Sequence, residues 1–376
     1  MSHPTNPKYI AIAGGLTGGP IAPLLAVTDY WRTKDELITP VIFDVRNSFG
    51  KTVAQRRNIR FYSITTGKLR RYWTIKNFLA PFLLLIGLIQ SLYYLSKLRP
   101  RLVLGAGGFA QLPVMYAAWI LRIPRVIHQQ DVSVTLSNRL CTPIANLITT
   151  TFEGSIRDFP QGSGLGKKYI QGTKVYWTGN PASLPDKHSK FPADIKLNGE
   201  LPVLLVFGGA SGAAALNKII ADAVPTLSRV VEIIHITGPG KNLFKPAKNY
   251  HPIEILTSMK PVYEAVDVVL GRAGINTLTE LAEFGKPGII VPMPDTHQEV
   301  NAELIFRSGS AMVLDQNSLN GDLLVKAIRK IIFEPDRQKK YVTNLRKLFK
   351  SNAAREIVSL IEHTVLHKSS KQNYAK

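Results

Sequence analysis

The stretch VVLGRAGINTLTELAEFGKPGIIVPMPDTHQEVNA, Val268 to Ala302, decides the fold class of this chain. Val268 to Leu270 and a second apolar run, Gly288 to Val291, have the length and composition of buried strands. A turn at Gly271 to Gly274 leads from the first run into a predicted helix that ends near Phe284. A strand, a helix and a strand in this order predict one unit of a parallel, doubly wound sheet.

A ligand of such a unit binds beyond the carboxyl ends of the strands, where the helix N-terminus offers free N–H groups. Glu280 lies about one and a half turns into the predicted helix, where its carboxylate can accept hydrogen bonds from sugar hydroxyls. The loop Pro292 to Gln298 is expected to return beside it. The alternative is that Glu280 is an ordinary solvated carboxylate, and this stretch alone leaves both interpretations open.

The same alternation of strand and helix occurs throughout the chain and predicts two α/β domains with parallel sheets and right-handed crossovers. In each domain the first strand runs into a glycine-rich turn, GGLTGG at Gly14 to Gly19 and FGGASGA from Phe207, and the first domain has a further turn, GAGGF, at Gly105 to Phe109. Such turns bring backbone N–H groups close to a phosphate or a sugar. The remaining predicted strands are Tyr9–Ala13, Val41–Asp44, Arg60–Ile64, Arg101–Leu104, Pro124–His128, Ala145–Thr150, Glu232–Thr237, Glu254–Leu256 and Ala311–Leu314.

Two acid/base candidates follow the strand Pro124 to His128, at the edge where the glycine turns of the first domain converge. His128 has an unperturbed pKa near neutrality, and the Asp131 carboxylate could take a proton from a hydroxyl. The alternative for His128 is a hydrogen-bonded histidine at a strand end. The alternative for Asp131 is the N-cap of a helix that begins near Val134.

The composition limits the class of protein. At 376 residues the chain is long enough for two domains, and its formal charge of +21 predicts attraction to an anionic partner such as a diphosphate, lipid headgroups or nucleic acid. Nucleic acid is the less favoured partner, because no RNA-reading motif, zinc finger or basic helix occurs. A single cysteine, Cys141, excludes an internal disulfide, the N-terminus lacks the pattern of a secretory signal, and no motif requires a metal or a cofactor.

The apolar stretch FLAPFLLLIGLIQSLYYL, Phe78 to Leu95, could span a membrane, lie on its surface or be a buried core helix. It is nearly long enough to span a bilayer but contains Pro81, Gly87 and Gln90, and basic residues flank it on both sides. These features favour a helix that lies in the interface of an anionic membrane over a buried core helix or a true span.

Taken together, the motifs GGLTGGPIAP, TGKLRRY, GAGGFAQLP, IPRVIHQQD, TGNP, FGGASGA and RAGINTLTE, in this order and spacing, resemble the MurG family over Tyr9 to about Leu314. This resemblance implies a GT-B fold, in which two Rossmann-like domains face each other across a cleft. It implies inverting transfer of N-acetylglucosamine from UDP-GlcNAc to lipid-linked N-acetylmuramyl-pentapeptide in peptidoglycan synthesis, at the cytoplasmic face of the cell membrane. A transferase with another acceptor and a homologue that binds UDP-sugar without turnover remain alternatives.

The resemblance also implies site residues and boundaries. Asp131 and His128 are the catalytic candidates, and the acceptor is expected near Gly107, Gly108, Phe109 and Asn138. The donor is expected near Thr17, Gly18, Gly19, Asp131, Ser183, Ala210, Ser211, Gly212, Leu256, Ile275, Asn276, Thr277, Leu278, Thr279, Glu280 and Gln298, with Glu280 on the ribose hydroxyls. The expected boundaries are an acceptor domain at 1–183, a linker at 184–200, a donor domain at 201–341, a C-terminal helix at about 342–366 that packs back on the first domain, and a basic tail at 367–376.

The chain departs from the family pattern at several positions. The first glycine loop commonly carries a histidine, where this sequence has Gly19 and Pro20. The arginine that usually follows the NP motif is Ser183, and the Ser-Gln pair of the FGGASGA loop is Ala210 and Ser211. These departures leave Asp131 as the candidate to deprotonate the acceptor hydroxyl, with helix N-termini replacing part of the missing positive charge.

Overall fold

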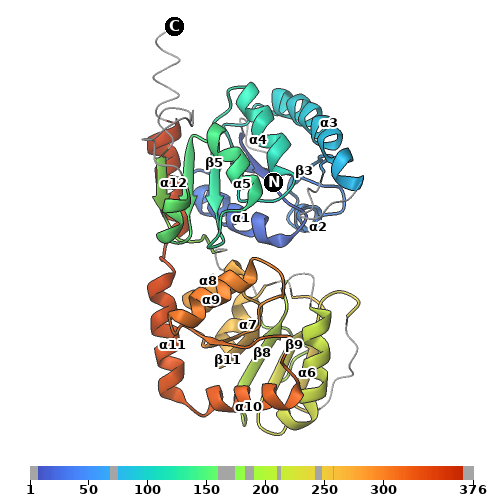
Figure 1. The fold of residues 1–376 in the computed structure, drawn as a ribbon, viewed down its shortest axis with the longest axis vertical. Coiled ribbons are helices and arrows are strands. Elements are labelled where there is room, and N and C mark those ends of the chain that lie inside the picture. The colour runs from blue at the N-terminus through green and yellow to red at the C-terminus, as the bar shows by residue number, and fades with distance from the viewer. Residues whose placement is uncertain are drawn as a thin grey trace. The chain divides into compact units, whose positions relative to one another are not determined.

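The structure, a computed structural model, describes residues 7–67, 75–159, 174–182, 190–209, 213–241, 248–256 and 258–366, without the side chains of residues 75–78. The chain divides into two compact units, Met1–Leu184 with Lys350–Lys376, and Pro185–Phe349. Figure 1 shows each unit as a sheet with helices packed on it. The predicted fold class, two Rossmann-like domains, is confirmed by two parallel sheets with alternating helices.

The first unit contains a parallel sheet with strand order β3-β2-β1-β4-β5-β6-β7. The order reverses between β1 and β4, which is where ligands bind in open parallel sheets. Its elements are β1 (Lys8–Ala13), α1 (Gly18–Arg32), β2 (Ile38–Asp44), α2 (Phe49–Arg56), β3 (Arg60–Ser63), α3 (Ile75–Leu98), β4 (Leu102–Gly105), α4 (Gln111–Ile120), β5 (Arg125–Gln129), α5 (Leu136–Cys141), η1 (Thr142–Ile144), β6 (Leu147–Thr150), η2 (Gly154–Asp158), β7 (Lys174–Trp177), α12 (Ala353–Leu360) and η3 (Ile361–Leu366).

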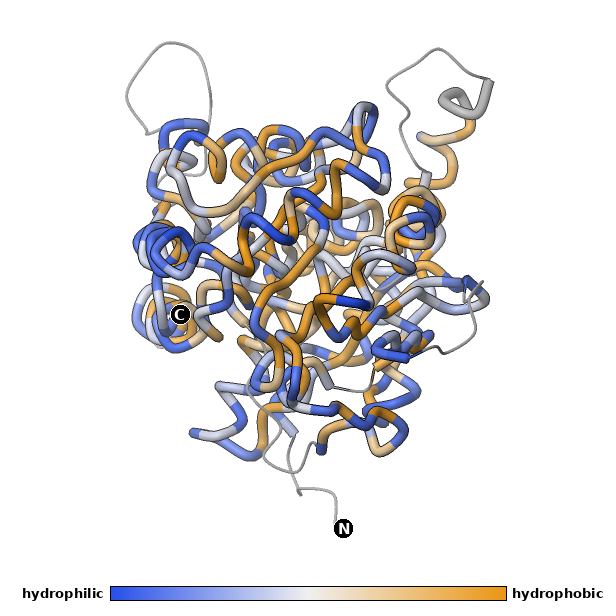
Figure 2. Tube along the Cα trace, turned by 90° about the horizontal axis from the view of Figure 1, so that it is seen from below, coloured by the Kyte–Doolittle hydropathy of each residue, from blue (hydrophilic) through white to orange (hydrophobic). Residues whose placement is uncertain are grey.

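Each face of this sheet has its own hydrophobic core, because side chains alternate along a strand. In β1, Ile10 and Ile12 pack with α1 and the C-terminal helices, whereas Ala11 and Ala13 pack with α3 and α4 on the other face. Figure 2 shows hydrophobic stretches running through the interior and hydrophilic stretches mostly outside. Burial on both faces explains why the strands read as continuous apolar runs in the sequence.

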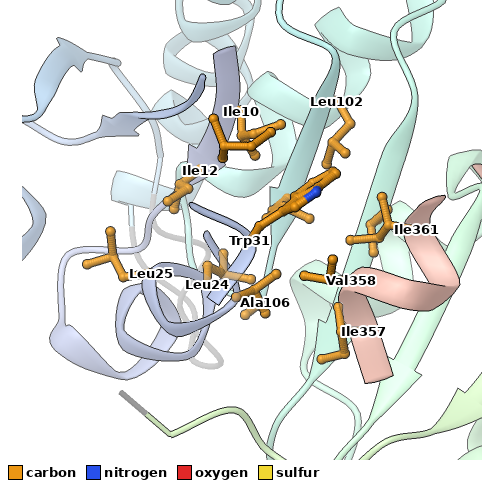
Figure 3. Packing of buried hydrophobic residues seen from close by; sticks show 14 of the residues in the cluster. Ile10, Ile12, Leu24, Leu25, Trp31, Leu102, Ala106, Ile357, Val358 and Ile361 are labelled. Atoms are coloured by element: carbon orange, nitrogen blue, oxygen red, sulfur yellow. The ribbon is translucent and has the colours of Figure 1, made fainter. Parts of the chain in front are cut away.

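The C-terminal helices complete the first of these cores. Ile357, Val358 and Ile361 lie beside Trp31 of α1 (Figure 3). The Trp31 Nε1 donates to the Glu362 Oε1 at 2.8 Å. At the start of this segment Lys350 Nζ donates to the Trp177 carbonyl at 3.2 Å and lies 5.1 Å from the centre of its ring. The C-terminal segment is therefore part of the first unit.

The second unit contains a parallel sheet with strand order β10-β9-β8-β11-β12-β13, and its order reverses between β8 and β11. Its core lies between this sheet and helices that include α6 and α10. The elements are β8 (Val203–Phe207), α6 (Ala214–Leu227), β9 (Glu232–Ile236), β10 (Tyr250–Ile253), α7 (Lys260–Ala265), β11 (Val268–Gly271), α8 (Ile275–Phe284), β12 (Gly288–Ile290), α9 (Gln298–Arg307), β13 (Met312–Val313), α10 (Gly321–Ile332) and α11 (Pro335–Leu348).

Several predicted elements differ from the structure. The strand predicted at Glu254–Leu256 is wrong, because β10 ends at Ile253. β10 contains Pro252, and a proline in the sequence usually indicates that a segment is not a strand. β10 lies at the edge of the sheet, where proline is tolerated. The edge strand β7 was not predicted, because it is short and only partly buried. The helix expected near Val134 begins at Leu136 and is capped by Thr135, so Asp131 is not its N-cap.

The boundaries of the units depend on where the chain returns to the first unit. The segment expected to pack back, about 342–366, is divided between the units, because Arg346 of α11 donates from Nε to the Ala282 carbonyl of the second unit at 3.1 Å. Part of the expected linker also belongs to the second unit, since the Asn198 N–H donates to the buried Glu232 carboxylate at 2.9 Å. The tail 367–376 lies outside the described residues.

Helix α3 has an exposed apolar face. Leu79–Leu98 is long and apolar enough to cross a membrane by length and composition alone, with 22% of its most apolar window buried. Its exposed large side chains share one side of the helix and are Leu79, Phe82, Leu85, Ile86, Ile89 and Tyr93.

The two glycine turns of the first unit touch through their backbones. A Cβ on Gly15 would lie 2.4 Å from the Cα of Gly108, and a Cβ on Gly108 would lie 2.4 Å from the Cα of Gly15. Gly108 also has a φ of +98°, a conformation that side chains rarely adopt. The turns after β1 and β4 therefore fit together only without side chains at these two positions.

Replacement of Gly108 by alanine is expected to lower the free energy of unfolding of the first unit by about 3 kcal/mol, through overpacking and backbone strain. Urea denaturation followed by tryptophan fluorescence measures the change. Gly154→Ala is the matched control, because a Cβ there meets no atom within 4 Å. Equal stability of the two variants would contradict the contact.

Candidate active site

Asp44, at the end of β2, holds the first glycine turn. Its Oδ1 accepts from the Leu16 N–H at 3.1 Å and from the Val45 N–H at 2.7 Å, and its Oδ2 is buried without a hydrogen-bond partner in the described structure. Burial raises the pKa of this carboxyl, and the neighbouring N–H groups offset only part of the increase. Leu16, held in this way, has a φ of 77°, and its carbonyl accepts from the Phe49 N–H at 3.0 Å.

The loop shaped by Asp44 exposes the start of α1. Thr17 is its N-cap and lies exposed with Gly19, whereas Gly18 is half-buried against Phe49. The Thr17 side chain does not cap the helix, and its first turn contains no acidic residue. The predicted residues Thr17, Gly18 and Gly19 therefore lie together at a helix N-terminus, an environment that attracts anions.

Buried amide side chains connect the second glycine turn to the loop after β5. Gln111 accepts from the Gly107 N–H at 2.5 Å and donates to the Asn138 Oδ1 at 2.8 Å. Asn138 in turn donates to the Gln129 Oε1 at 2.6 Å, and Gln129 donates to the carbonyl of Asp131 at 2.8 Å. Gln111 and Gln129 belong to the quoted motifs GAGGFAQLP and IPRVIHQQD, but their link through Asn138 was not predicted, since they are too far apart in sequence to suggest a pair.

These amide hydrogen bonds determine whether Asn138 and Asp131 can contact a ligand. Asn138, expected at the acceptor, is completely buried beneath the loops and uses its side chain to join them. Asp131 keeps part of its surface exposed, and its backbone is fixed by Gln129. Gly107 is buried, whereas Gly108 and Phe109 are half-buried, and the Phe109 carbonyl accepts from the Thr66 hydroxyl at 2.9 Å.

His128 does not have the geometry of an acid/base catalyst. It is 2% exposed, its Nδ1 lies 2.9 Å from the Thr149 hydroxyl, and its Nε2 lies 3.2 Å from the Asn180 Oδ1. Burial lowers the pKa of His128 to about 4, and the hydrogen bond with Asn180 opposes only part of the decrease. The geometry supports the alternative interpretation, a neutral histidine that joins the ends of β5 and β6 to the turn after β7.

In the second unit Gly208, just after β8, lies close to Ala213, just before α6. A Cβ on Gly208 would lie 2.2 Å from the Cβ of Ala213, whereas Gly209, at a φ of +92°, has open space around it. The donor residues predicted here and after the NP motif lie outside the described residues: Ala210, Ser211, Gly212 and Ser183.

Helix α8 begins at the edge where β11 ends, as the sequence predicts. Its N-cap, Gly274, is extended and provides no capping side chain. Asn276 and Glu280 keep exposed surface. The other side chains of this run expected at the uridine are buried in the unit: Ile275, Thr277, Leu278 and Thr279.

Glu280 is held by Tyr263 of α7, whose hydroxyl donates to the Glu280 Oε2 at 2.8 Å. Burial raises the pKa of Glu280 to about 7, the hydrogen bond from Tyr263 lowers it, and the nearby Glu283 raises it. This carboxylate therefore titrates near neutrality, which a freely solvated surface glutamate does not do.

The remaining predicted donor residues lie on other elements of the second unit. Leu256 is half-buried just beyond β10, and Gln298 is the first residue of α9, with its Oε1 accepting from the Met293 N–H at 3.1 Å. Arg272, the first residue of RAGINTLTE, was not predicted as a site residue. It is buried after β11 and donates to the Val291 carbonyl at 3.1 Å and to the Gln316 Oε1 at 2.6 Å. Its position directly after an apolar strand was the signal available in the sequence.

The described residues contain no group of three or more His, Cys, Asp or Glu side chains that could hold a metal ion. The starts of α1 and α8, which no N-cap side chain caps, offer backbone N–H groups to an anionic ligand, and Glu280 can accept hydrogen bonds from hydroxyls.

Comparisons with known proteins cover both units. The sequence model of the glycosyltransferase family 28 N-terminal domain matches residues 10–150, and that of the family 28 C-terminal domain matches residues 203–359. Among solved structures, Acinetobacter baumannii MurG has a TM-score of 0.67 at 23% identity and covers 95% of this chain and 99% of its own. A calicheamicin glycosyltransferase has a TM-score of 0.66 at 12% identity and covers 96% and 100%. These structures show that the fold is shared.

Two sequence relatives carry the same name, UDP-N-acetylglucosamine–N-acetylmuramyl-(pentapeptide) pyrophosphoryl-undecaprenol N-acetylglucosamine transferase. The relative from Legionella pneumophila (strain Paris) is 32% identical over 365 residues, 94% of this chain and 96% of the relative. The relative from Lachnoclostridium phytofermentans is 31% identical over 369 residues, 96% of this chain and 99% of the relative. With both family 28 domains present and relatives matched along nearly its whole length, this chain belongs to glycosyltransferase family 28 and, within it, to the MurG family.

Proposed function

We propose that this protein is an inverting hexosyltransferase that moves N-acetylglucosamine from UDP-GlcNAc to lipid-linked N-acetylmuramyl-pentapeptide in peptidoglycan synthesis. The observation that carries the proposal is the match, over 94% of this chain, to relatives named for this reaction. The alternatives, another acceptor or UDP-sugar binding without turnover, are kept because the first-loop histidine and the arginine of the family pattern are absent at Pro20 and Ser183.

The donor is assigned to the second unit. The ribose hydroxyls of UDP donate to Glu280, and the exposed side chain of Asn276 and the backbone N–H groups at the start of α8 lie on the same helix. The N-termini of helices supply positive potential that stabilises the diphosphate as it leaves. Leu256 and Gln298 follow neighbouring elements and complete the predicted donor site.

The acceptor is assigned to the first unit, at the two glycine turns. Gly108 and Phe109 offer exposed surface there. The exposed start of α1, with Thr17, Gly18 and Gly19, offers N–H groups that suit an anionic part of the donor, the role that the resemblance implies for these residues. Asp131 deprotonates the attacking C4 hydroxyl of the muramyl saccharide, and the oxygen attacks the anomeric carbon of the donor with inversion. Asp131 takes this role because His128 is buried with both ring nitrogens hydrogen-bonded, whereas Asp131 is partly exposed.

Attachment to an anionic membrane surface is assigned to α3. The exposed apolar side chains of this helix would enter the headgroup region, while Lys97, Arg99 and Arg101 follow at its end. The protein is thus proposed to be peripheral, on the cytoplasmic face of the membrane, and nucleic acid is not among its proposed partners. The formal charge of +21 strengthens the attraction to anionic lipid.

The central experiment is transfer of labelled N-acetylglucosamine from UDP-GlcNAc to a lipid-linked muramyl-pentapeptide acceptor by the purified chain. Labelled disaccharide-lipid is the expected product. Binding of UDP-GlcNAc without transfer to this acceptor would contradict the proposal. Transfer to a different glycolipid in a parallel screen would identify the alternative acceptor.

Asp131→Asn is expected to lower kcat on the order of a hundredfold, because the amide cannot accept the hydroxyl proton. The dissociation constant of UDP-GlcNAc should stay within about twofold of the original value, since the substitution removes no donor ligand of the second unit. Steady-state kinetics and calorimetric binding measure the two quantities. Unchanged turnover would remove Asp131 from the mechanism.

Glu280→Gln is expected to change the pH dependence of stability. The pKa of Glu280 is raised from 4.5 to about 7 in the folded protein, so its stabilising contribution is complete below pH 4.5 and is lost as pH rises through 7. The glutamine variant does not show this loss. The difference in free energy of unfolding, variant minus unaltered chain, should therefore be higher at pH 8.5 than at pH 4.5 by at most about 3 kcal/mol. Urea unfolding without ligand at both pH values tests this, and the same difference at both would contradict it.

Phe82→Glu is expected to reduce binding to anionic lipid vesicles at least about tenfold, because a charged side chain opposes entry of α3 into the interface. Phe306→Glu is the matched control, since Phe82 is 68% exposed and Phe306, in the second unit, is 67% exposed. Vesicle co-sedimentation measures the binding. Equal effects of the two substitutions would exclude α3 as the attachment surface. A separate check is that a peripheral protein should be released from membrane pellets by washing at alkaline pH.

A further inference from the structure

Tyr263 is fixed in place by aromatic side chains from two other elements. Its side chain is 0% exposed, and its ring stacks on that of Phe284 with centroids 4.9 Å apart and an interplanar angle of 9°. The Phe207 ring meets it nearly at a right angle, with centroids 6.3 Å apart. Because α7, α8 and β8 all contribute, the direction of the hydroxyl is set by packing.

The hydroxyl of Tyr263 uses only one oxygen of the Glu280 carboxylate. It donates to Oε2 at 2.8 Å. The other oxygen, Oε1, accepts no hydrogen bond from the described part of the chain and is not among its buried unsatisfied atoms, so it keeps some exposed surface. One oxygen is therefore anchored inside the unit and the other is available to a ligand.

The direction of the hydrogen bond is also fixed. Burial, together with the charge and the hydrogen bond of Glu280, raises the pKa of Tyr263 well above its usual value, so the phenol stays neutral and donates. A donor to the carboxylate favours its charged form, which is the form that accepts two hydroxyl hydrogen bonds.

Other charged groups around α8 do not replace this donor. Glu283, on the same helix, opposes ionisation of Glu280. Arg346 of α11 is directed to the Ala282 carbonyl, and Lys286 is directed to the Val266 carbonyl at 2.7 Å. On α7, Lys260 pairs with Glu264 at 3.5 Å. Within the described residues, Tyr263 is thus the group that stabilises the Glu280 anion.

We propose that Tyr263 is a positioning residue for the sugar nucleotide: by anchoring Oε2 it favours the ionised form of Glu280 and directs Oε1 to the ligand hydroxyls. The inference rests on the proposed role of Glu280 toward the ribose of UDP-GlcNAc. Its consequence is that nucleotide affinity near neutral pH depends on a phenol that does not touch the nucleotide.

The test compares UDP-GlcNAc binding by the full chain and its Tyr263→Phe variant between pH 5.5 and 9, using titration calorimetry. Loss of the donor raises the pKa of Glu280, so the pH at which affinity is half lost should rise by about one unit or more. The dissociation constant should increase about fivefold or more at pH 7 and approach the original value at pH 9. The value of kcat at saturating donor should not change, because the phenol has no part in the transfer step.

Tyr250→Phe provides the matched control in the same unit. Tyr250 is 1% exposed, and its hydroxyl lies 2.9 Å from the His235 Nδ1, so the substitution also removes one buried tyrosine hydroxyl from a hydrogen bond. It is expected to lower thermal stability without moving the pH midpoint of binding. A Tyr263→Phe variant that behaves in the same way would overturn the inference.

Glu280→Gln separates failure of the inference from failure of the proposed donor site. If Glu280→Gln abolishes binding but Tyr263→Phe leaves the pH midpoint of binding unchanged, only the role of Tyr263 is overturned. Binding that is unaffected by Glu280→Gln overturns the ribose contact as well. A raised midpoint in Tyr263→Phe, with weak binding by Glu280→Gln at every pH, supports both.

Discussion

The contact between the backbones of Gly15 and Gly108 is the constraint on which the first unit depends. The two turns follow neighbouring strands, β1 and β4, at the point where the strand order reverses. Their close approach lets Gln111 bind the second turn from below and lets Asn138 and Gln129 extend the connection to the loop that carries Asp131. The loop that carries Asp131, the proposed proton acceptor, is thus held through its backbone by a fully buried set of amides, and a loop that is already ordered loses less entropy when substrates bind.

The second unit has a reversal of strand order at the corresponding place but uses a different device. There the functional carboxylate is on a helix, and a buried aromatic cluster orients it. Amides hold a loop without changing its charge, whereas a phenol against a carboxylate also controls ionisation. This difference agrees with the roles assigned to the two carboxylates, a proton acceptor in one unit and a hydroxyl acceptor in the other.

The parts of the fold that could be predicted are those encoded by local pattern. Buried strands of a parallel sheet are continuous apolar runs, so most of them and the Gly274 start of α8 were found from the sequence. Pairs that form only in the folded unit could not be found: Tyr263 with Glu280, and His128 with Thr149 and Asn180. The burial of His128 also could not be inferred, because a histidine at a strand end has the same local sequence whether it faces a ligand or the core. Asp44 offered a signal that was missed, a charged residue at the end of an apolar strand.

The packing of the last helices against Trp31 has a consequence for biosynthesis. The core on one face of the first sheet contains Ile10 and Leu24 from the beginning of the chain and Val358 and Ile361 from near its end. During translation the N-terminal unit must therefore wait, with part of this core open, until the whole second unit has left the ribosome. The second unit is formed by one continuous segment and can fold first. Until the last helices arrive, the first unit exposes apolar surface and is prone to aggregation, so chaperones would need to cover this surface.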